Sequence, residues 1–282
     1  MFKILRQSIR TGVVTRPYPD EPSGPPPVFR GKPVIDFARC TACGRCADAC
    51  PTGAITLRDA DGKESQKLLS LSYGSCIFCG ACEDACPDAI SLTREYRLAT
   101  GQKDALTVEA LYKEEAGKMR FVRMTAQETP GETARGLEDI GAEFRSRIHE
   151  LFGRSLQIRE VDAGSCNGCE IEITALTNAI YDIERFGIHF VASPRHADML
   201  LVTGPVTRNM EIALKQTYDA TPEPRLVVAV GACAISGGIF GKSYASCGGV
   251  DTVVPVDVYI PGCPPRPEAL LHGILLALGR KK

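Results

Sequence analysis

The chain has 282 residues, 44% hydrophobic and 24% charged, and a formal net charge of -1. This is the composition of a folded globular protein rather than a disordered one, and the balanced charge excludes nucleic acid as an expected partner. No apolar run approaches the roughly 20 residues that cross a bilayer. The N-terminal sequence also lacks the apolar region and cleavage site of a secretory signal, so we expect a reducing cytoplasmic setting.

Residues 1–33 are expected to form an extended strap that begins with a short amphipathic helix. Phe2, Leu5 and Ile9 recur at the spacing of one helical face. Seven prolines lie between residues 11 and 34, and proline-rich segments run extended over a surface. The helix is expected to dock on a neighbouring subunit or on another part of the chain, with a lipid surface as the alternative.

Residues 34–95 contain an internal repeat of cysteines, which are the outstanding feature of the composition. Two runs of the form C-x-x-C-x-x-C-x-x-x-C-P extend from Cys40 to Pro51 and from Cys76 to Pro87. This spacing is that of bacterial ferredoxins with two 4Fe-4S clusters, in which the fourth cysteine of each run ligates the other cluster. We therefore predict an α+β two-cluster ferredoxin-like domain. The predicted ligands are Cys40, Cys43, Cys46 and Cys86 for cluster 1, and Cys76, Cys79, Cys82 and Cys50 for cluster 2.

The small residues between these cysteines are expected to let backbone N–H groups approach the cluster sulfurs, which raises the reduction potential. They are Ala42, Gly44, Gly80 and Ala81. Two zinc sites are the alternative for the same cysteines. A zinc site needs only two C-x-x-C pairs, so it leaves the third cysteine and the proline of each run unexplained.

Residues 96–136 are expected to form a connector, because they are polar and are interrupted by glycine and proline. A short helical pattern lies within this segment near 108–118. Beyond it, apolar residues recur at helical spacing up to Gly153 and mark the start of a second domain, 137–282. These apolar residues are Ile140, Phe144, Ile148 and Leu151.

The second domain is predicted to be an α/β flavodoxin-like domain with a mainly parallel sheet. Segments 199–202 and 226–230 are almost entirely apolar, as strands buried on both faces are. Strand-like segments lie at 156–161, 189–192, 199–204, 225–230 and 256–260, and helix-like segments lie at 169–182, 207–219 and 266–279. Ligands of such sheets bind at the carboxyl ends of the strands.

Four further cysteines fall at these strand ends. Cys166 and Cys169 follow the first strand at the start of a helix, while Cys233 and Cys263 follow two later strands. The four are expected to converge at one edge of the sheet. A redox-active C-x-x-C pair is the alternative for the first two, but it leaves the other two unexplained. Cys247 is expected to be a free thiol, and an exchange with Cys233 as ligand is the alternative.

Several charged residues near these cysteines are expected to have structural roles. Glu170 is interpreted either as a polar group facing a partner subunit or as an acid stabilised in the first turn of a helix. Arg195, Asp198 and Arg266 are expected to fix loops or to contact a partner. The histidines form no spaced cluster in the sequence, and none is predicted to bind a metal: they are His149, His189, His196 and His272.

The sequence resembles two protein families joined in one chain. The motifs SCNGCE (165–170), SPRHADMLLVTGPV (193–206) and VGACAISGG (230–238), with the stretch 256–274, resemble the small subunit shared by energy-converting NiFe hydrogenases and respiratory complex I. Residues 1–92, with FRGKP and CPTGAI, resemble the two-cluster ferredoxin subunit of the same complexes, especially that of formate hydrogenlyase.

This resemblance implies a third 4Fe-4S cluster, the proximal one, beside a separate large subunit that contains the nickel-iron centre. Its implied ligands are Cys166, Cys169, Cys233 and Cys263. Complex I small subunits carry two adjacent cysteines at the first ligand position, whereas hydrogenase small subunits carry C-x-x-C followed by glutamate. Since Cys166, Cys169 and Glu170 have the second form, the hydrogenase branch is favoured.

The resemblance thus implies a non-catalytic electron-transfer subunit with three 4Fe-4S clusters, part of a membrane-bound NiFe hydrogenase complex of the formate hydrogenlyase type. Expected partners are the hydrogenase large subunit, a ferredoxin-like electron-donor subunit linked to formate dehydrogenase, and integral membrane subunits. The expected location is peripheral, on the cytoplasmic side of the cell membrane. Two alternatives are an electron-transfer module of a complex I-like quinone oxidoreductase and a zinc-stapled assembly scaffold.

Overall fold

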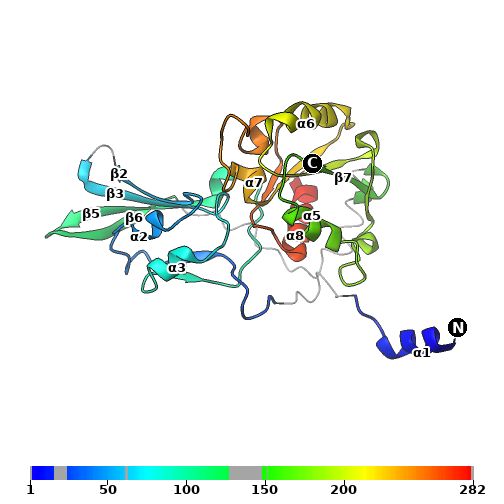
Figure 1. The fold of residues 1–282 in the computed structure, drawn as a ribbon, viewed down its shortest axis with the longest axis horizontal. Helices are drawn as coiled ribbons and strands as arrows, with labels where there is room; N and C mark the ends of the chain where they lie inside the picture. Colours follow the sequence, from blue (N-terminus) through cyan, green and yellow to red (C-terminus); the bar gives the residue numbers. More distant parts are fainter. Residues whose placement is uncertain (1, 16–23, 61–62, 127–147, 151, 281–282) are drawn as a thin grey trace.

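The computed structural model describes residues 2–15, 24–60, 63–126, 148–150 and 152–280. The strands in these residues form three sheets, a small antiparallel pair, a four-stranded antiparallel sheet and a five-stranded parallel sheet (Figure 1). The first two belong to the N-terminal half, and the parallel sheet with its helices forms the C-terminal half. The order of a ferredoxin-like half followed by an α/β half is therefore as predicted.

The cysteine repeat is visible in the backbone of the N-terminal half. Strand β1 (Pro33–Ile35) pairs with β4 (Ile90–Leu92), and between them lie the short helices α2 (Arg45–Asp48) and α3 (Ala81–Ala85). Each helix begins after a glycine in the left-handed region, with φ values of 84° and 89°. Only a residue without a Cβ adopts this conformation freely, so the glycines start both helices in the same way.

The four-stranded sheet has the order β2-β3-β5-β6 and extends away from the C-terminal half (Figure 1). Its bounds are β2 (Ile55–Ala60), β3 (Lys63–Ser72), β5 (Thr107–Glu115) and β6 (Lys118–Ala126). A short 3-10 helix, η1 (Lys103–Leu106), precedes β5. Part of the predicted connector is therefore folded onto the hairpin that follows the first cysteine run.

The prediction of a helix near 108–118 is wrong, because this segment forms a β-hairpin. Val108, Ala110 and Tyr112 are buried and alternate with more exposed residues, which is the period of a strand. Ala116 and Gly117 have φ values of 51° and 74°, as the two central residues of a tight hairpin turn require. Ile140, Phe144 and Leu151 of the other predicted helix lie outside the described residues.

All neighbouring strands of the five-stranded sheet run parallel, in the order β11-β10-β9-β7-β8. The strands are β7 (Leu156–Asp162), β8 (Ile188–Phe190), β9 (Met199–Thr203), β10 (Leu226–Val230) and β11 (Val258–Ile260). The helices are α5 (Gly168–Ala175), α6 (Arg208–Ala220), α7 (Gly231–Ser236) and α8 (Pro267–Arg280). The predicted parallel sheet is confirmed, although the first helix ends at Ala175, before the predicted residue 182.

Two apolar cores cover the two faces of the parallel sheet. Alternate residues of β9 divide between them, with Leu200 and Val202 in one core and Met199 and Leu201 in the other. The first core continues without a break into the N-terminal half, where it includes Leu69. Burial on both faces explains the continuous apolar runs of β9 and β10.

Polar contacts also join the two halves. Lys103 and Asp251 form an ion pair of 2.7 Å, and the Ser236 hydroxyl donates to the Gly74 carbonyl at 3.2 Å. Thr100 and Tyr259 exchange two backbone hydrogen bonds, so the segment that follows β4 pairs with the outer strand β11. The cysteines of the two halves are thereby held in a defined relative position.

The predicted N-terminal helix is present as α1 (Phe2–Thr11), which has no buried residues and lies apart from the three sheets (Figure 1). Its apolar side chains are largely exposed, with Phe2 at 88% and Ile9 at 76%. In the described part of the chain, no helix combines the length and the apolar character that crossing a membrane requires.

Candidate functional site

The first group of cysteines lies where the loop before α2 meets the end of α3. Cys40, Cys43 and Cys46 come from the first cysteine run, and Cys86 comes from the second. All four line one cavity of about 100 Å³. The structure thus brings together the four residues predicted for cluster 1, and we call them thiol set 1.

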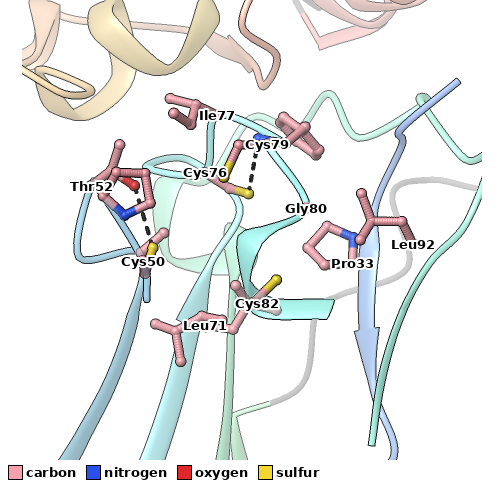
Figure 2. Close-up of a pocket in the computed structure, with 14 residues that line it drawn as sticks. Pro33, Cys50, Thr52, Leu71, Cys76, Ile77, Cys79, Gly80, Cys82 and Leu92 are labelled. Carbon is pink, nitrogen blue, oxygen red and sulfur yellow. Dashed lines mark hydrogen bonds between the residues drawn. The ribbon is translucent and has the colours of Figure 1, made fainter. Parts of the chain in front are cut away.

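The second group is the complement of the first. Cys50, from the first run, and Cys76, Cys79 and Cys82, from the second, line a cavity of about 20 Å³. Figure 2 shows their sulfur atoms around a common space between the loop that precedes α3 and the loop that begins at Cys50. These residues are thiol set 2. As predicted, the fourth cysteine of each run lies with the first three cysteines of the other run.

The third group lies at the carboxyl edge of the parallel sheet. Cys166 and Cys169 follow β7, Cys233 follows β10 inside α7, and Cys263 follows β11. The pKa of Cys169 is raised above its ordinary value by burial first, and then by a neighbouring carboxylate and by the other three thiols. Because all four interact electrostatically, they form one group, thiol set 3.

A glycine allows the close approach of two loops in thiol set 3. Gly231, at the start of α7, has a φ of 85°, and a Cβ added there would lie 2.8 Å from the Cys169 sulfur. Any larger residue would displace this thiol and strain the backbone as well. Gly231, in the VGACAISGG motif, therefore lets Cys169, which follows β7, lie close to the segment that follows β10 and carries Cys233.

Burial and repulsion between neighbouring thiolates oppose ionisation of some thiols in each of the three sets. The pKa is raised to about 12 for Cys46 and Cys76 and to about 11 for Cys82 and Cys233. Burial is the largest cause each time, and the neighbouring thiolates of the same set add to it. Four thiolates at such a position require a cationic centre, so the donor sets fit iron-sulfur clusters.

Other properties of the cysteines agree with this fit. No disulfide joins any of the thirteen cysteines, all of which the structure describes. The backbone N–H of Ala42 donates to the Cys40 sulfur at 3.4 Å, and that of Phe78 donates to the Cys76 sulfur at 3.3 Å. These matching bonds in sets 1 and 2 agree with the expectation that N–H groups approach the sulfurs.

An arginine that sequence analysis did not single out acts on set 1. The Arg45 Nε donates to the Cys43 sulfur at 3.5 Å. This hydrogen bond is the main cause that lowers the pKa of Cys43 to about 7. Both side chains lie at the surface, so the Cys43 thiol is accessible to reagents as well as readily ionised at neutral pH. The role of Arg45 is evident only from its contact with Cys43, since nothing in the sequence distinguishes it from an ordinary surface arginine.

We predict that Arg45→Gln slows the reaction of Cys43 with a disulfide reagent in the metal-free protein. With the pKa at about 7, about half of Cys43 is thiolate at pH 7, compared with a few per cent at the ordinary value near 8.5. A thiolate of higher pKa is the better nucleophile, so the net loss of rate is about three- to fivefold. Peptide mass spectrometry follows the labelling of Cys43 directly.

The matched control for this experiment is Arg39→Gln. Arg39 is exposed and is paired with Asp36 at 3.5 Å instead of with a thiol. Its replacement should leave the labelling rate of Cys43 unchanged. Equal rates for the Arg45→Gln variant and the unchanged protein between pH 6 and 8 would contradict the role given to Arg45.

The remaining predicted residues lie around the three thiol sets. Cys247 is buried and its thiol donates to the Glu211 carboxylate at 3.2 Å, so it lies outside the sets as a free thiol. Glu170 lies in the first turn of α5, and both of its carboxylate oxygens are buried without a hydrogen-bond partner among the described residues. Asp198 accepts hydrogen bonds from Arg154 and from the Gln157 N–H, both at 2.9 Å.

Arg195 and the histidines are not part of the thiol sets. Arg195 lies in the short 3-10 helix η3 (Pro194–His196), before β9. Burial lowers the pKa of His272 to about 4, so its imidazole is neutral at physiological pH. In the described ranges, no three His, Cys, Asp or Glu side chains, those of the thiol sets included, lie close enough together to hold a single metal ion.

Thiol sets 2 and 3 are neighbours across the junction of the two halves. The pKa of Cys263 is raised by burial, by Cys166 and also by Cys79 of set 2. A cavity of about 170 Å³ is lined by the Cys263 loop on one side and by Ile77 and Phe78 of the set 2 loop on the other. The order in space is therefore set 1, set 2 and set 3.

Two protein-family models match the chain. The family described as "4Fe-4S dicluster domain" matches residues 39–90, which contain thiol sets 1 and 2. The family described as "NADH ubiquinone oxidoreductase, 20 Kd subunit" matches residues 166–277, which contain thiol set 3. The two resemblances found in the sequence are thus confirmed, and they lie one after the other in a single chain.

Curated relatives include subunits of two kinds of complex. The probable membrane-bound hydrogenase subunit mbhJ of Pyrococcus furiosus is 51% identical over 133 residues, 47% of this chain and 80% of the relative. Formate hydrogenlyase subunit 7 of Escherichia coli is 50% identical over 138 residues, 49% of this chain and 54% of the relative. An NADH-quinone oxidoreductase subunit of Bacteroides thetaiotaomicron is 56% identical over 114 residues, 40% of this chain and 57% of the relative. The chain therefore spans just over half the length of the last two.

Proposed function

Because the chain belongs to the family of the 20 kDa subunit of NADH ubiquinone oxidoreductase, we propose that it is an electron-transfer subunit of a membrane-bound NiFe hydrogenase complex of the formate hydrogenlyase type. The observation that carries the proposal is the hydrogenase form of the first ligand motif, Cys166-x-x-Cys169-Glu170. It occurs in a chain that is 50% and 51% identical to two hydrogenase-type subunits over 49% and 47% of its length. The 4Fe-4S dicluster domain fused before it extends the electron path.

Each thiol set holds one 4Fe-4S cluster in this proposal, which gives three clusters. Bound clusters supply reversible one-electron transfer. The chain's own residues contribute twelve thiolates, the backbone donors of Ala42 and Phe78, and the burial that excludes water. The electrostatic interaction between Cys79 and Cys263 supports a path that runs from set 1 through set 2 to set 3.

The proposed domain limits follow the same division. Residues 34–95 form the two-cluster domain, and 137–282 form a flavodoxin-like domain. Numbered by position in the chain, the strands of the parallel sheet have the order 2-1-3-4-5, which is that of flavodoxin-like sheets. Within 96–136, strand β5 pairs with β3 of the two-cluster domain and β6 pairs with β5, so both strands are best grouped with that domain.

The partners in the proposed complex follow from this path. The exposed thiol of Cys43 favours set 1 as the end that receives electrons from a ferredoxin-like donor subunit. Cys166 and Cys263, exposed in set 3, then face the hydrogenase large subunit, which carries the nickel-iron centre. The chain is peripheral, on the cytoplasmic side of the cell membrane, and is attached through integral membrane subunits.

A complex I-like quinone oxidoreductase is the second candidate, favoured by the 56% identity to a subunit of an NADH-quinone oxidoreductase. The two candidates share the electron-transfer role of this chain and differ in the reaction of the large subunit. A nickel-containing partner belongs to the first, and a quinone-reducing partner belongs to the second.

The test is metal analysis of the complex purified anaerobically through a tag on this chain. We expect nickel in the complex and at least about 12 iron atoms for each copy of this chain, because the iron of the partner subunits adds to that of three clusters of four. Iron without nickel, together with quinone reduction, would favour the second candidate. A colourless preparation that contains zinc would reject both and support the assembly scaffold.

A further inference from the structure

The segment just before β1 is fixed tightly to the segment just after β4. The Gly31 N–H donates to the Thr93 carbonyl at 2.9 Å, and the Lys32 N–H donates to the Glu95 carbonyl at 3.0 Å. A Cβ on Gly31 would collide with the Glu95 carbonyl oxygen, so glycine is needed for this approach. Phe29 is thereby held beside Tyr96, with the two rings 6.5 Å apart and nearly perpendicular.

The same segment reaches the second thiol set through Arg30. The Arg30 Nη1 donates to the Cys79 carbonyl at 2.6 Å. The guanidinium also packs on Gly80, where an added Cβ would lie 3.7 Å from it. Arg30 therefore ties the strap to the loop that carries Cys79.

Arg266 approaches the same segment from the third thiol set. It lies three residues after Cys263, and its guanidinium donates two hydrogen bonds of 2.7 Å to the two carboxylate oxygens of Glu268. Glu268 is 1% exposed. The Arg266 guanidinium lies 5.4 Å from the Phe29 ring and 4.9 Å from the Tyr96 ring. The Arg266 guanidinium is thus fixed by a carboxylate in the first turn of α8 and by two aromatic rings of the N-terminal half.

Close packing does not fill the space between the loops of sets 2 and 3. The cavity of about 170 Å³ lies there, and Phe29, Tyr96 and Arg266 are part of its wall. Where side chains do not interdigitate, the separation of two loops depends on the contacts at the edge of the space. The contact of Arg266 with the two rings is such an edge contact.

We propose that Arg266 is a positioning residue that fixes the separation of thiol sets 2 and 3, and with it electron transfer between them. Arg266 reaches set 3 through the loop of Cys263, and it reaches set 2 through Phe29 and Arg30. The inference rests on the proposed function, because it assumes that both sets hold clusters. It goes beyond that function because it names the contact, between Arg266 and the two rings, that sets the distance between thiol sets 2 and 3.

The test removes the rings and keeps the arginine. Arg266→Met would leave Glu268 buried without its countercharge and would endanger folding. The double substitution Phe29→Leu and Tyr96→Leu leaves the Arg266–Glu268 pair intact. The matched control is Tyr218→Leu, which removes the ring 3.9 Å from Arg225, a similar contact formed by residues outside the three thiol sets. All proteins are studied as the complete complex.

The measurements are the magnetic interaction between the two reduced clusters, by electron paramagnetic resonance, and the rate of electron transfer between them after rapid reduction. In the double variant we expect loss of the magnetic splitting and slower transfer, while both clusters keep their own signals. Arg266→Lys should give the same result, because a lysine keeps the charge but has no flat guanidinium to face the rings. The control should behave as the unchanged complex does.

Two results would overturn the proposal. One is an unchanged splitting and rate in the double variant, and the other is the loss of a cluster signal, which would mean that the rings stabilise a cluster instead of its position. Failure of the proposed function looks different, because the unchanged complex would then lack the signal of the third cluster.

Discussion

Replacing Cys263 with alanine is expected to remove one cluster and to abolish hydrogen turnover. Iron should fall by about 4 atoms for each copy of this chain, because each cluster contains four. Cys263 lies in an exposed loop after β11. Among the described residues, no other thiol is placed to replace it as a ligand, since the thiol of Cys247 is hydrogen-bonded to Glu211. Iron and sulfide analysis, the cluster signals in electron paramagnetic resonance and hydrogen evolution measure the result.

The matched control for this substitution is Cys247→Ala, which removes a buried cysteine outside the three thiol sets. It should keep all the iron and the turnover. The Cys263 variant should also keep the two signals assigned to sets 1 and 2, because their ligands are all in the N-terminal half. Loss of all three signals from the Cys263 variant would contradict the division into separate sets, and loss of iron from the control would make Cys247 a ligand.

Removing the iron with a chelator, which also releases the cluster sulfide, is expected to unfold the helices of the cysteine repeat and to spare the parallel sheet. Helices α2 and α3 have 4 and 5 residues, too few to persist without tertiary contacts. Without the clusters these helices also hold thiols whose ionisation is unfavourable, because burial first, and then neighbouring thiolates, raise the pKa of Cys46 and Cys82. Strands β9 and β10, by contrast, are buried along their whole length in an apolar core.

Hydrogen exchange followed by mass spectrometry measures this difference within one sample. Amides of 45–48 and 81–85 should exchange quickly after chelation, while those of β9 and β10 should stay protected. The parallel sheet is thus the internal control. Protection lost equally in both places would show that the chain unfolds as a single cooperative unit, and protection kept in α2 and α3 would show that the clusters do not support their fold.

The sequence predicted those features that depend on local spacing. The offset between the two cysteine runs determines which thiols meet, and the structure gathers Cys86 with the first run and Cys50 with the second. Continuous apolar runs predicted the buried parallel strands β9 and β10, because a strand covered on both faces has no polar side. The convergence of Cys166, Cys233 and Cys263 then follows from the common direction of the strands.

Features that depend on contacts between distant residues could not be predicted. The charged residues near the end of β5 mask its alternation, so the sequence of 108–118 suggests a helix. Pairing with β3, a contact with a distant segment, makes it a strand. The bond from Arg45 to Cys43 depends on a rotamer that no motif specifies. The aromatic contacts of Arg266 join residues more than 160 positions apart in the sequence, because Phe29 and Tyr96 belong to the other half.

The unbroken core between the two halves means that their association is an intramolecular event. Two separate subunits with contacts such as Lys103–Asp251 and Ser236–Gly74 would come apart when diluted, because each encounter costs translational and rotational entropy. In one polypeptide each half is present at a high effective concentration around the other. Weakening this junction should therefore change the spacing of the halves without releasing either one, and the stoichiometry between set 2 and set 3 stays one to one at any protein concentration.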